Sequence, residues 1–356
     1  MISRRRLAHR TASALLGSGF LLGTRAIADA CTRVLWNSNN RAVIVGRTMD
    51  WPESTQPILT YLPAGMPRNG GRAGTETVVA ENAAHWTSKY SSLVTTIYGI
   101  GSVDGLNERG LGGHLLYLNA TDYGPRDPAK LGLNAGLWLQ FALDQAASVT
   151  EALAILATVQ IVMVEAHGHK ASVHLALEDA SGDSAIIEYI AGKPVIHHGR
   201  EYRVMTNDPS YDQQILLLKQ MSDAHDFSNP SSATPLPGNV SPTDRFQRAA
   251  YYEAVLPEPA NQREAVASMF AIMANVSVPF GAPYKGFGIY NTEYRTVTDL
   301  TTKTYFFQLT TSPSVIWAEL SKFILPAGGQ VFMLDPENIA LAGDVTSRFQ
   351  PAKAPF

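Results

Sequence analysis

The chain has too few cysteines for a disulfide bond and no excess of positive charge for binding a polyanion. Its 356 residues include one cysteine, with 45% hydrophobic and 17% charged residues. A single cysteine excludes intramolecular disulfides, so burial of apolar side chains must supply the stability. The net charge of −3 falls to about −7 without the first 30 residues, which carry five arginines and one aspartate. This balance argues against nucleic acid as a partner.

Several widespread catalytic motifs are missing as well. Beyond residue 30 there is no G-x-S-x-G elbow, no phosphate-binding G-x-x-x-x-G-K-[ST] loop and no H-E-x-x-H pair. The glycines of Gly99-Ile100-Gly101 lack the third glycine of a dinucleotide loop. The histidine pairs His167/His169 and His197/His198 have no carboxylate or cysteine at a metal-ligand spacing. We therefore expect no cofactor and no metal.

The first 30 residues have the pattern of an export signal. A basic segment at 1–10 precedes an apolar stretch at 12–23, and Ala28-Asp29-Ala30 forms a small-x-small cleavage site. The arginines permit either the general secretory or the twin-arginine route. No other apolar run reaches the length of a membrane span, so no stable membrane insertion is expected after the signal is removed. A cut between Ala30 and Cys31 predicts a periplasmic or secreted protein.

Such a cut would make Cys31 the first residue of the mature chain. An N-terminal cysteine carries a thiol nucleophile and an α-amine whose pKa of about 7.7 to 8.0 suits a general base. Two other interpretations stay open. A lone cysteine is commonly a small buried hydrophobe, and a cysteine at a cleavage site can also be a lipid anchor, although Ala28 and Asp29 fit a lipoprotein signal poorly.

Short strands and helices alternate irregularly along the rest of the chain, which predicts an α+β fold in one domain over residues 31–356. A polar turn at 37–40 would join the first two strands into a hairpin, and Ser241-Pro242 would begin a capped helix. A segment rich in Ser, Pro, Asn and Gly at 226–241 is expected to be a surface loop. The expected strands are 31–36, 42–51, 93–100, 112–119, 171–177, 185–190, 295–299, 304–310 and 314–317, and the expected helices are 137–146, 149–159, 241–256 and 261–274.

The predicted hairpin would bring two charged residues back to the cysteine. Arg47 and Asp50 lie 16 and 19 positions after Cys31, on the returning strand. A guanidinium favours a thiolate over a thiol, and a carboxylate can orient the α-ammonium group. The same pair could equally be solvated charges at a strand end.

Four segments in this order resemble the choloylglycine hydrolase family, which includes bile salt hydrolases and penicillin V acylases. The resemblance implies an N-terminal nucleophile hydrolase with an αββα four-layer sandwich that cleaves linear amides, and a homotetramer. The export signal resembles the Gram-negative branch of the family. The segments are Cys31 with Gly46-Arg47-Thr48-Met49-Asp50-Trp51, then Asp104-Gly105-Leu106-Asn107-Glu108-Arg109-Gly110-Leu111, then Met205-Thr206-Asn207-Asp208-Pro209, and Ser241-Pro242-Thr243-Asp244-Arg245-Phe246.

The resemblance implies roles for individual residues. Cys31 would be the nucleophile, Arg47 and Asp50 would tune it, and Asn207 would donate a hydrogen bond in the oxyanion hole. Arg245 would be a further active-site arginine, with Arg248 as the alternative one helical turn later. A backbone N–H at Tyr117, or at Asn119 in an alternative alignment, would complete the oxyanion hole.

The resemblance also implies a small-molecule amide as substrate. Trp51, and Trp86 in the segment 81–90, would suit an apolar acyl pocket. We expect penicillin V-like amides or long-chain N-acyl homoserine lactones, with conjugated bile salts as the alternative. A different class of function, a non-catalytic exported binding protein or lipoprotein on the same scaffold, also stays open.

Overall fold

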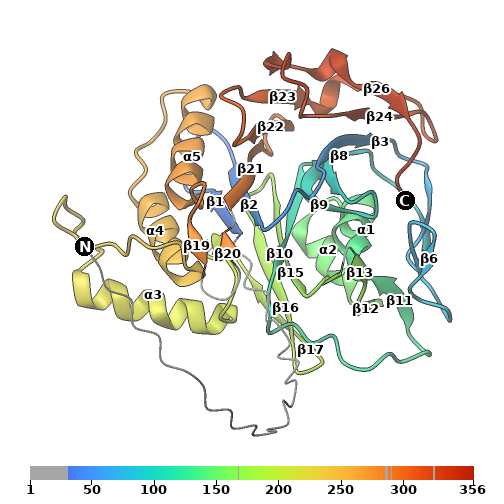
Figure 1. The fold of residues 1–356 in the computed structure, drawn as a ribbon, viewed down its shortest axis with the longest axis horizontal. Coiled ribbons are helices and arrows are strands. Elements are labelled where there is room, and N and C mark those ends of the chain that lie inside the picture. Colours follow the sequence, from blue (N-terminus) through green and yellow to red (C-terminus); the bar gives the residue numbers. More distant parts are fainter. Residues whose placement is uncertain (1–30, 167, 285–287, 290, 324) are drawn as a thin grey trace, which may run out of the picture.

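Two large β-sheets packed face to face form the centre of the molecule (Figure 1). The computed structural model describes residues 31–166, 168–284, 288–289, 291–323 and 325–356. The predicted signal at 1–30 and His167 lie outside the described residues. Cys31, the expected nucleophile, immediately precedes the first strand.

The first sheet contains the N-terminal hairpin and the late strands. Its described strands, all antiparallel to their neighbours except the last pair, are β18 (Val204–Met205), β1 (Thr32–Trp36), β2 (Ile44–Trp51), β21 (Asn291–Asp299), β22 (Thr304–Leu309), β23 (Ile316–Glu319) and β25 (Gly343–Asp344), in this order across the sheet. The hairpin turn is stabilised by the side chain of Asn39, whose Oδ1 accepts hydrogen bonds from the backbone N–H groups of Arg41 and Ala42, both at 2.9 Å. The predicted hairpin is confirmed.

The second sheet is antiparallel and contains the middle of the chain with two C-terminal strands at one edge. Its described strands, in order, are β17 (Lys193–His198), β16 (Ser184–Ile190), β15 (Val173–Asp179), β10 (Leu111–Tyr117), β9 (Gly101–Asn107), β8 (Ser92–Ile97), β3 (Ile58–Leu62), β24 (Val331–Leu334) and β26 (Gln350–Ala352). Short two-stranded pairings lie around it: β11 (Leu131–Asn134) with β12 (Val159–Val162), β13 (Glu165–Ala166) with β14 (His169–Lys170), β19 (Pro283–Tyr284) with β20 (Gly288–Ile289), β4 (Pro67–Asn69) with β7 (His85–Thr87), and β5 (Arg72–Ala73) with β6 (Glu76–Thr77).

Helices cover the outer faces of both sheets. The helices α4 (Pro242–Ala254) and α5 (Gln262–Val276) pack on the first sheet, and α1 (Trp138–Gln145) and α2 (Val149–Leu156) pack on the second (Figure 1). Neighbouring residues of β10 illustrate the layering, because Leu116 belongs to the core between the sheets and Leu115 to the core beneath α1. This arrangement is the predicted αββα sandwich.

The structure also differs from the expected elements. Helix α3 (Tyr211–His225) was not predicted, because its run of adjacent apolar residues does not follow a helical period and few of its side chains are buried. The strand expected at 93–100 ends at Ile97, where Tyr98 and Gly99 take positive φ values. The helix expected at 149–159 ends at Leu156 and is followed by β12. In the described part of the chain, the helices are too short or too polar to span a bilayer.

Gly101 lies where β9 packs closely against the segment before α1. A Cβ at this position would overlap the backbone carbonyl oxygen of Gly136, which no side-chain rotation can relieve. We expect Gly101→Ala to lower the free energy of unfolding by about 2 kcal/mol. Gly238→Ala is the matched control, because open space surrounds that position, and its effect should stay within about 0.5 kcal/mol. Urea unfolding measures both, and equal effects would contradict the packing.

Candidate active site

Strand pairing places Cys31 beside the returning strand of the hairpin. Thr32 pairs with Thr48, and the thiol of Cys31 lies next to the two residues that follow. Its Sγ is 3.8 Å from Sδ of Met49 and 3.9 Å from the carbonyl oxygen of Asp50. Only 2% of Cys31 is exposed, and the residue lines a cavity.

Arg47 lies buried between the two sheets. Its Nη2 donates to the carbonyl oxygen of Leu115 at 3.0 Å and contacts Sδ of Met49 at 3.4 Å, and Nη1 lies 3.7 Å from a carboxylate oxygen of Asp104. Burial alone would lower the pKa of Arg47, but electrostatic interactions with its surroundings, the Asp104 carboxylate among them, outweigh burial and raise the pKa above its ordinary value. The guanidinium is therefore a permanent positive charge next to the thiol.

Asp50 is a buried carboxylate held by hydroxyl groups. Thr292 donates to Oδ1, Thr48 donates to Oδ2 at 3.2 Å, and Nη1 of Arg245 lies 3.8 Å from Oδ2. Burial raises the pKa of Asp50 to about 6, and Arg245 and the two threonines offset only part of this effect. At neutral pH the carboxylate form is favoured, and it balances the charge of Arg245.

Asn207 connects the backbone of Cys31 to the second sheet. The Cys31 backbone N–H donates to Oδ1 of Asn207 at 2.5 Å, and Nδ2 of Asn207 donates to the carbonyl oxygen of Tyr117 at 2.7 Å. An amide nitrogen carries two hydrogens, so one donor position remains beyond the Tyr117 bond. Tyr117 lines the cavity, whereas Asn119 is exposed and donates its backbone N–H to Asp208 at 2.8 Å. The structure thus places Tyr117, rather than Asn119, at the cavity.

Arg245, in the first turn of α4, also contacts Cys31 and Asn207. Ser241 caps this helix by accepting from the backbone N–H of Asp244 at 3.1 Å. The Arg245 guanidinium donates to the carbonyl oxygen of Cys31 at 2.7 Å, to the hydroxyl of Thr32 and to Oδ1 of Asn207 at 3.1 Å. Arg248 instead donates to Asn275 and to backbone carbonyls of the loop before the helix. The side chain of Arg248, the alternative from the sequence analysis, is therefore bonded elsewhere and not to Cys31.

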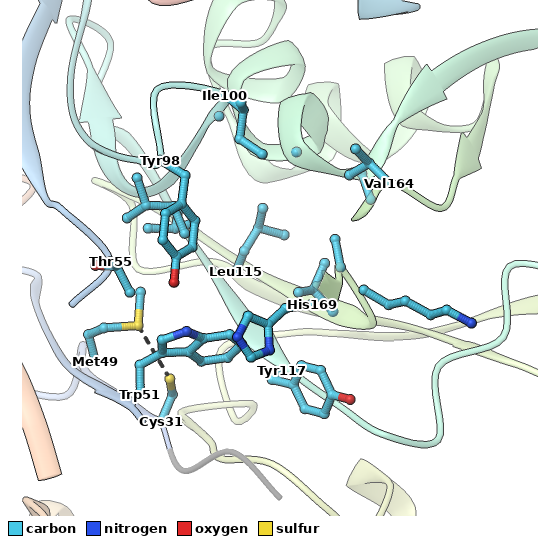
Figure 2. A pocket seen from close by; sticks show the side chains of 18 of the residues that line it. Cys31, Met49, Trp51, Thr55, Tyr98, Ile100, Leu115, Tyr117, Val164 and His169 are labelled. Carbon is cyan, nitrogen blue, oxygen red and sulfur yellow. Dashed lines mark hydrogen bonds between the residues drawn. The ribbon is translucent and has the colours of Figure 1, made fainter. Parts of the chain in front are cut away.

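An apolar cavity of about 750 Å³ including its open mouth extends from Cys31 (Figure 2). Figure 2 shows Cys31 at one end beside Trp51, with Ile100 and Val164 towards the other end. Trp51 packs edge-on against Tyr117 and His169, at centroid distances of 6.2 and 5.1 Å. The other apolar residues along the wall are Met49, Ile97, Tyr98, Val103, Leu115, Ala135, Ala171 and Val173.

Trp86 does not lie where the sequence analysis expected it. Its ring packs edge-on against Phe141 of α1, and its Nε1 donates to Asp144 at 2.8 Å. Neither Trp86 nor these neighbours line the cavity. The ring fills space beneath the helix layer, so we correct the expectation that Trp86 lines the acyl pocket.

The sequence analysis assigned no role to the charged residues behind Arg47. Asp104 begins one of the segments that carry the resemblance, and His114 and Glu178 lie on neighbouring strands of the second sheet. One signal was available, because a histidine at position 114 interrupts the otherwise apolar strand 111–117. A polar side chain flanked by core residues on a central strand indicates a buried partner.

Known proteins resemble this chain in sequence over most of its length. The family model described as linear amide C-N hydrolases, choloylglycine hydrolase family, matches residues 31–334. A penicillin V acylase of Pectobacterium atrosepticum is 34% identical over an alignment of 386 positions. The alignment covers 100% of this chain and 99% of the relative. A bile salt hydrolase/transferase of Bifidobacterium longum is 23% identical and covers 80% of this chain and 93% of the relative.

Solved structures show the same fold. The penicillin V acylase from Agrobacterium tumefaciens superposes with a TM-score of 0.80 at 37% identity, over 91% of this chain and 98% of that one. A conjugated bile acid hydrolase from Clostridium perfringens superposes with a TM-score of 0.72 at 20% identity, over 88% and 98%. These structures confirm the predicted fold class.

The two arginines of α4 form a matched pair for testing the site. Arg245→Lys keeps the charge but loses the planar array of donors that joins Cys31, Thr32 and Asn207, so we expect kcat/KM for amide hydrolysis to fall about 10- to 100-fold. Arg248→Lys should leave kcat/KM within about twofold, because its contacts lie away from Cys31. Steady-state kinetics measure both variants, and a larger loss in Arg248→Lys would show that the wrong arginine was placed at the site.

Proposed function

This chain belongs to the choloylglycine hydrolase family of linear amide C-N hydrolases, and we propose that it is an exported acylase whose nucleophile is the thiol of Cys31, uncovered when residues 1–30 are removed. Family membership establishes an amide hydrolase. The identity of the nucleophile, the processing step and the substrate are the parts that we propose.

The observation that carries the proposal is the position of Cys31 among both apolar and polar groups. Cys31 lines an apolar cavity that can hold an acyl group. The buried guanidinium of Arg47 lines the same cavity and interacts electrostatically with Cys31, and the backbone nitrogen of Cys31 is bonded to Asn207. A buried hydrophobic cysteine has no use for these polar partners, so the arrangement favours a nucleophile.

The chemistry follows from these contacts. Sγ of Cys31 attacks the amide carbonyl carbon, and the remaining donor position of Asn207 with a backbone N–H near Tyr117 stabilises the developing oxyanion. The α-ammonium group gives a proton to the leaving nitrogen as the C–N bond breaks, which leaves a thioester on Cys31. Water then attacks the thioester as the α-amine takes one of its protons, and the acid departs from Sγ.

The cavity favours a substrate with an apolar or aromatic acyl group. Its wall is formed largely by aliphatic and aromatic side chains, with His169 and Lys170 among the polar ones. We propose penicillin V-like amides or long-chain N-acyl homoserine lactones as substrates, and the penicillin V acylase relatives at 34% and 37% identity support the first class. The more distant bile salt hydrolases keep conjugated bile salts as the second candidate.

Processing is the first property to test. In the unprocessed chain the nitrogen of Cys31 is an amide, which cannot act as a base, so a precursor blocked at the cut should show less than about 1% of the mature activity. Cys31→Ala in the processed form should be equally inactive. The measurement is hydrolysis of penicillin V, a long-chain acyl homoserine lactone and a conjugated bile salt, together with the intact mass of the exported protein.

The same experiment separates the competing classes. An unmodified mass beginning at Cys31, with activity lost in Cys31→Ala, supports the acylase. A lipid adduct on Cys31 identifies a lipoprotein instead. Full activity in Cys31→Ala, or in the blocked precursor, contradicts the proposed nucleophile, and no turnover of any amide by the processed wild-type protein favours a binding protein.

Two tryptophans provide a matched pair for the acyl pocket. Trp51→Ala removes an aromatic wall of the cavity, and we expect kcat/KM for an aromatic acyl substrate to fall about 10- to 100-fold. Trp86→Ala removes a ring of similar size outside the cavity, so it should lower the melting temperature while kcat/KM stays within about threefold. If both variants lose kcat/KM equally, the cavity described above is not the acyl site.

A further inference from the structure

A row of five charged side chains crosses the space between the two sheets behind Cys31. From the first sheet come Arg33 of β1 and Arg47 of β2, and from the second sheet come Asp104 of β9, His114 of β10 and Glu178 of β15. Each of the five is at most 1% exposed. Burying so many charges is costly unless each serves as the partner of another, so their order in the row is informative.

The contacts alternate in sign along the row. Arg33 lies 2.6 Å from Oε2 of Glu178, whose Oε1 lies 2.8 Å from Nε2 of His114. Nδ1 of His114 lies 2.9 Å from Oδ1 of Asp104, whose Oδ2 lies 3.7 Å from Nη1 of Arg47. The row therefore runs from Arg33 of β1 to Arg47 of β2, whose guanidinium lies near the Cys31 thiol.

Strand register builds this row. Arg33 and Arg47 are direct partners in the β1–β2 ladder, and two like charges in such a position repel each other. The facing sheet supplies the compensating carboxylates, and His114 is the direct ladder partner of Asp104. Gly112 makes room for the other carboxylate, because a Cβ there would lie 2.7 Å from Oε1 of Glu178.

The position of His114 between two carboxylates favours a charged ring. Nε2 is hydrogen-bonded to Glu178 at 2.8 Å, and Nδ1 lies 2.9 Å from Asp104 without the alignment of a hydrogen bond, so this second contact is an ion pair that only an imidazolium can make. Burial alone would lower the pKa of His114, but Glu178 and Asp104 outweigh it and raise the pKa to about 9. Burial would raise the pKa of both carboxyls, but His114 and the arginines hold these pKa values below their usual range.

The remaining groups around the row do not change its charge. Tyr294 of β21 and Tyr305 of β22 face it, and burial keeps the pKa of each well above its usual value, so both stay neutral. Thr296 donates a hydrogen bond to Asp104. On the far side of Cys31, Asp50 and Arg245 compensate each other. Three cations and two anions therefore leave one positive charge in excess, and Cys31 lies at the Arg47 end.

We propose that His114 is a positioning residue for the nucleophile: as a buried imidazolium it holds Asp104 against Arg47 and leaves the row with one positive charge that stabilises the Cys31 thiolate. This inference rests on the proposed function of Cys31. If the ring became neutral, Asp104 would compensate Arg47 fully and the row would have no net charge. The thiolate would then lose the excess positive charge of the row and keep only its own α-ammonium group as a counter-charge, although no atom of His114 touches the substrate.

The test uses the fact that Cys31 is the only cysteine, so alkylation by iodoacetamide reports on this thiol alone. The rate is measured against pH on the exported, processed protein. In His114→Gln, which has the shape to bridge but no charge, we expect the midpoint to move up by about one pH unit, so that alkylation below the midpoint slows about tenfold. The acid limb of kcat/KM should move with it.

His174→Gln is the matched control. His174 is also buried on the second sheet, with Nδ1 3.0 Å from a carboxylate oxygen of Glu188 and Nε2 2.8 Å from the Thr206 carbonyl oxygen, and neither partner belongs to the row. This variant removes a buried histidine without touching the charge behind Arg47, so its alkylation midpoint should match that of the wild type. An unmoved midpoint in His114→Gln, or equal shifts in both variants, overturns the inference.

A second measurement does not depend on a folded variant. The ¹⁵N chemical shifts of the histidine rings in the wild-type protein report protonation of both nitrogens, and His114 should stay doubly protonated at pH 7.5, whereas a neutral ring there overturns the inference. If Cys31→Ala keeps its activity, the proposed function fails. If Cys31→Ala is inactive and the His114→Gln midpoint is unmoved, the proposed function stands and only this inference fails.

Discussion

The burial of Arg47 is the constraint on which the rest of the site depends. Removing a guanidinium from water costs several kcal/mol unless its donors and its charge find partners. Arg47 belongs to the first sheet by its backbone, but its guanidinium donates to the carbonyl oxygens of Val103 and Leu115 on the second. The two sheets must therefore pack in one relative position, and this position also fixes the start of β1, where Cys31 lies.

Polar and apolar surroundings meet at the thiol, and each increases the effect of the other. The cavity in front of Cys31 is lined largely by hydrocarbon, which keeps water away from the charges behind it. Coulombic interactions are stronger in such a medium than in solvent. The proposed thiolate at this boundary would therefore interact more strongly with Arg47 than it would in water.

Sequence patterns predicted what is encoded locally. The turn at 37–40 and the cap at Ser241 each depend on neighbours a few positions apart, and both were found. The gathering of Cys31, Asn207 and Arg245 was predicted only through the family resemblance, because these residues lie far apart in the chain. Spacing along the chain predicted only that Arg47 and Asp50 would lie near Cys31, through the hairpin.

The features that were missed depend on how layers pack. Trp86 could face the cavity or the helix layer with the same local sequence, and only the position of Phe141 decides between them. The contacts of His114 join β10 to both of its neighbours in the second sheet, and Glu178 lies 64 residues away in the chain. Such contacts have no short-range pattern, and a polar residue in an apolar strand is the most that a sequence can indicate.

The depth of Cys31 in the fold bears on the order of events during maturation. Its backbone nitrogen is buried and bonded to Asn207, and its carbonyl oxygen is bonded to Arg245. A peptidase needs an extended, accessible segment around the bond that it cleaves. If residues 1–30 are removed as we propose, the cut before Cys31 must come before the first sheet closes against α4, and folding would then enclose the new amine.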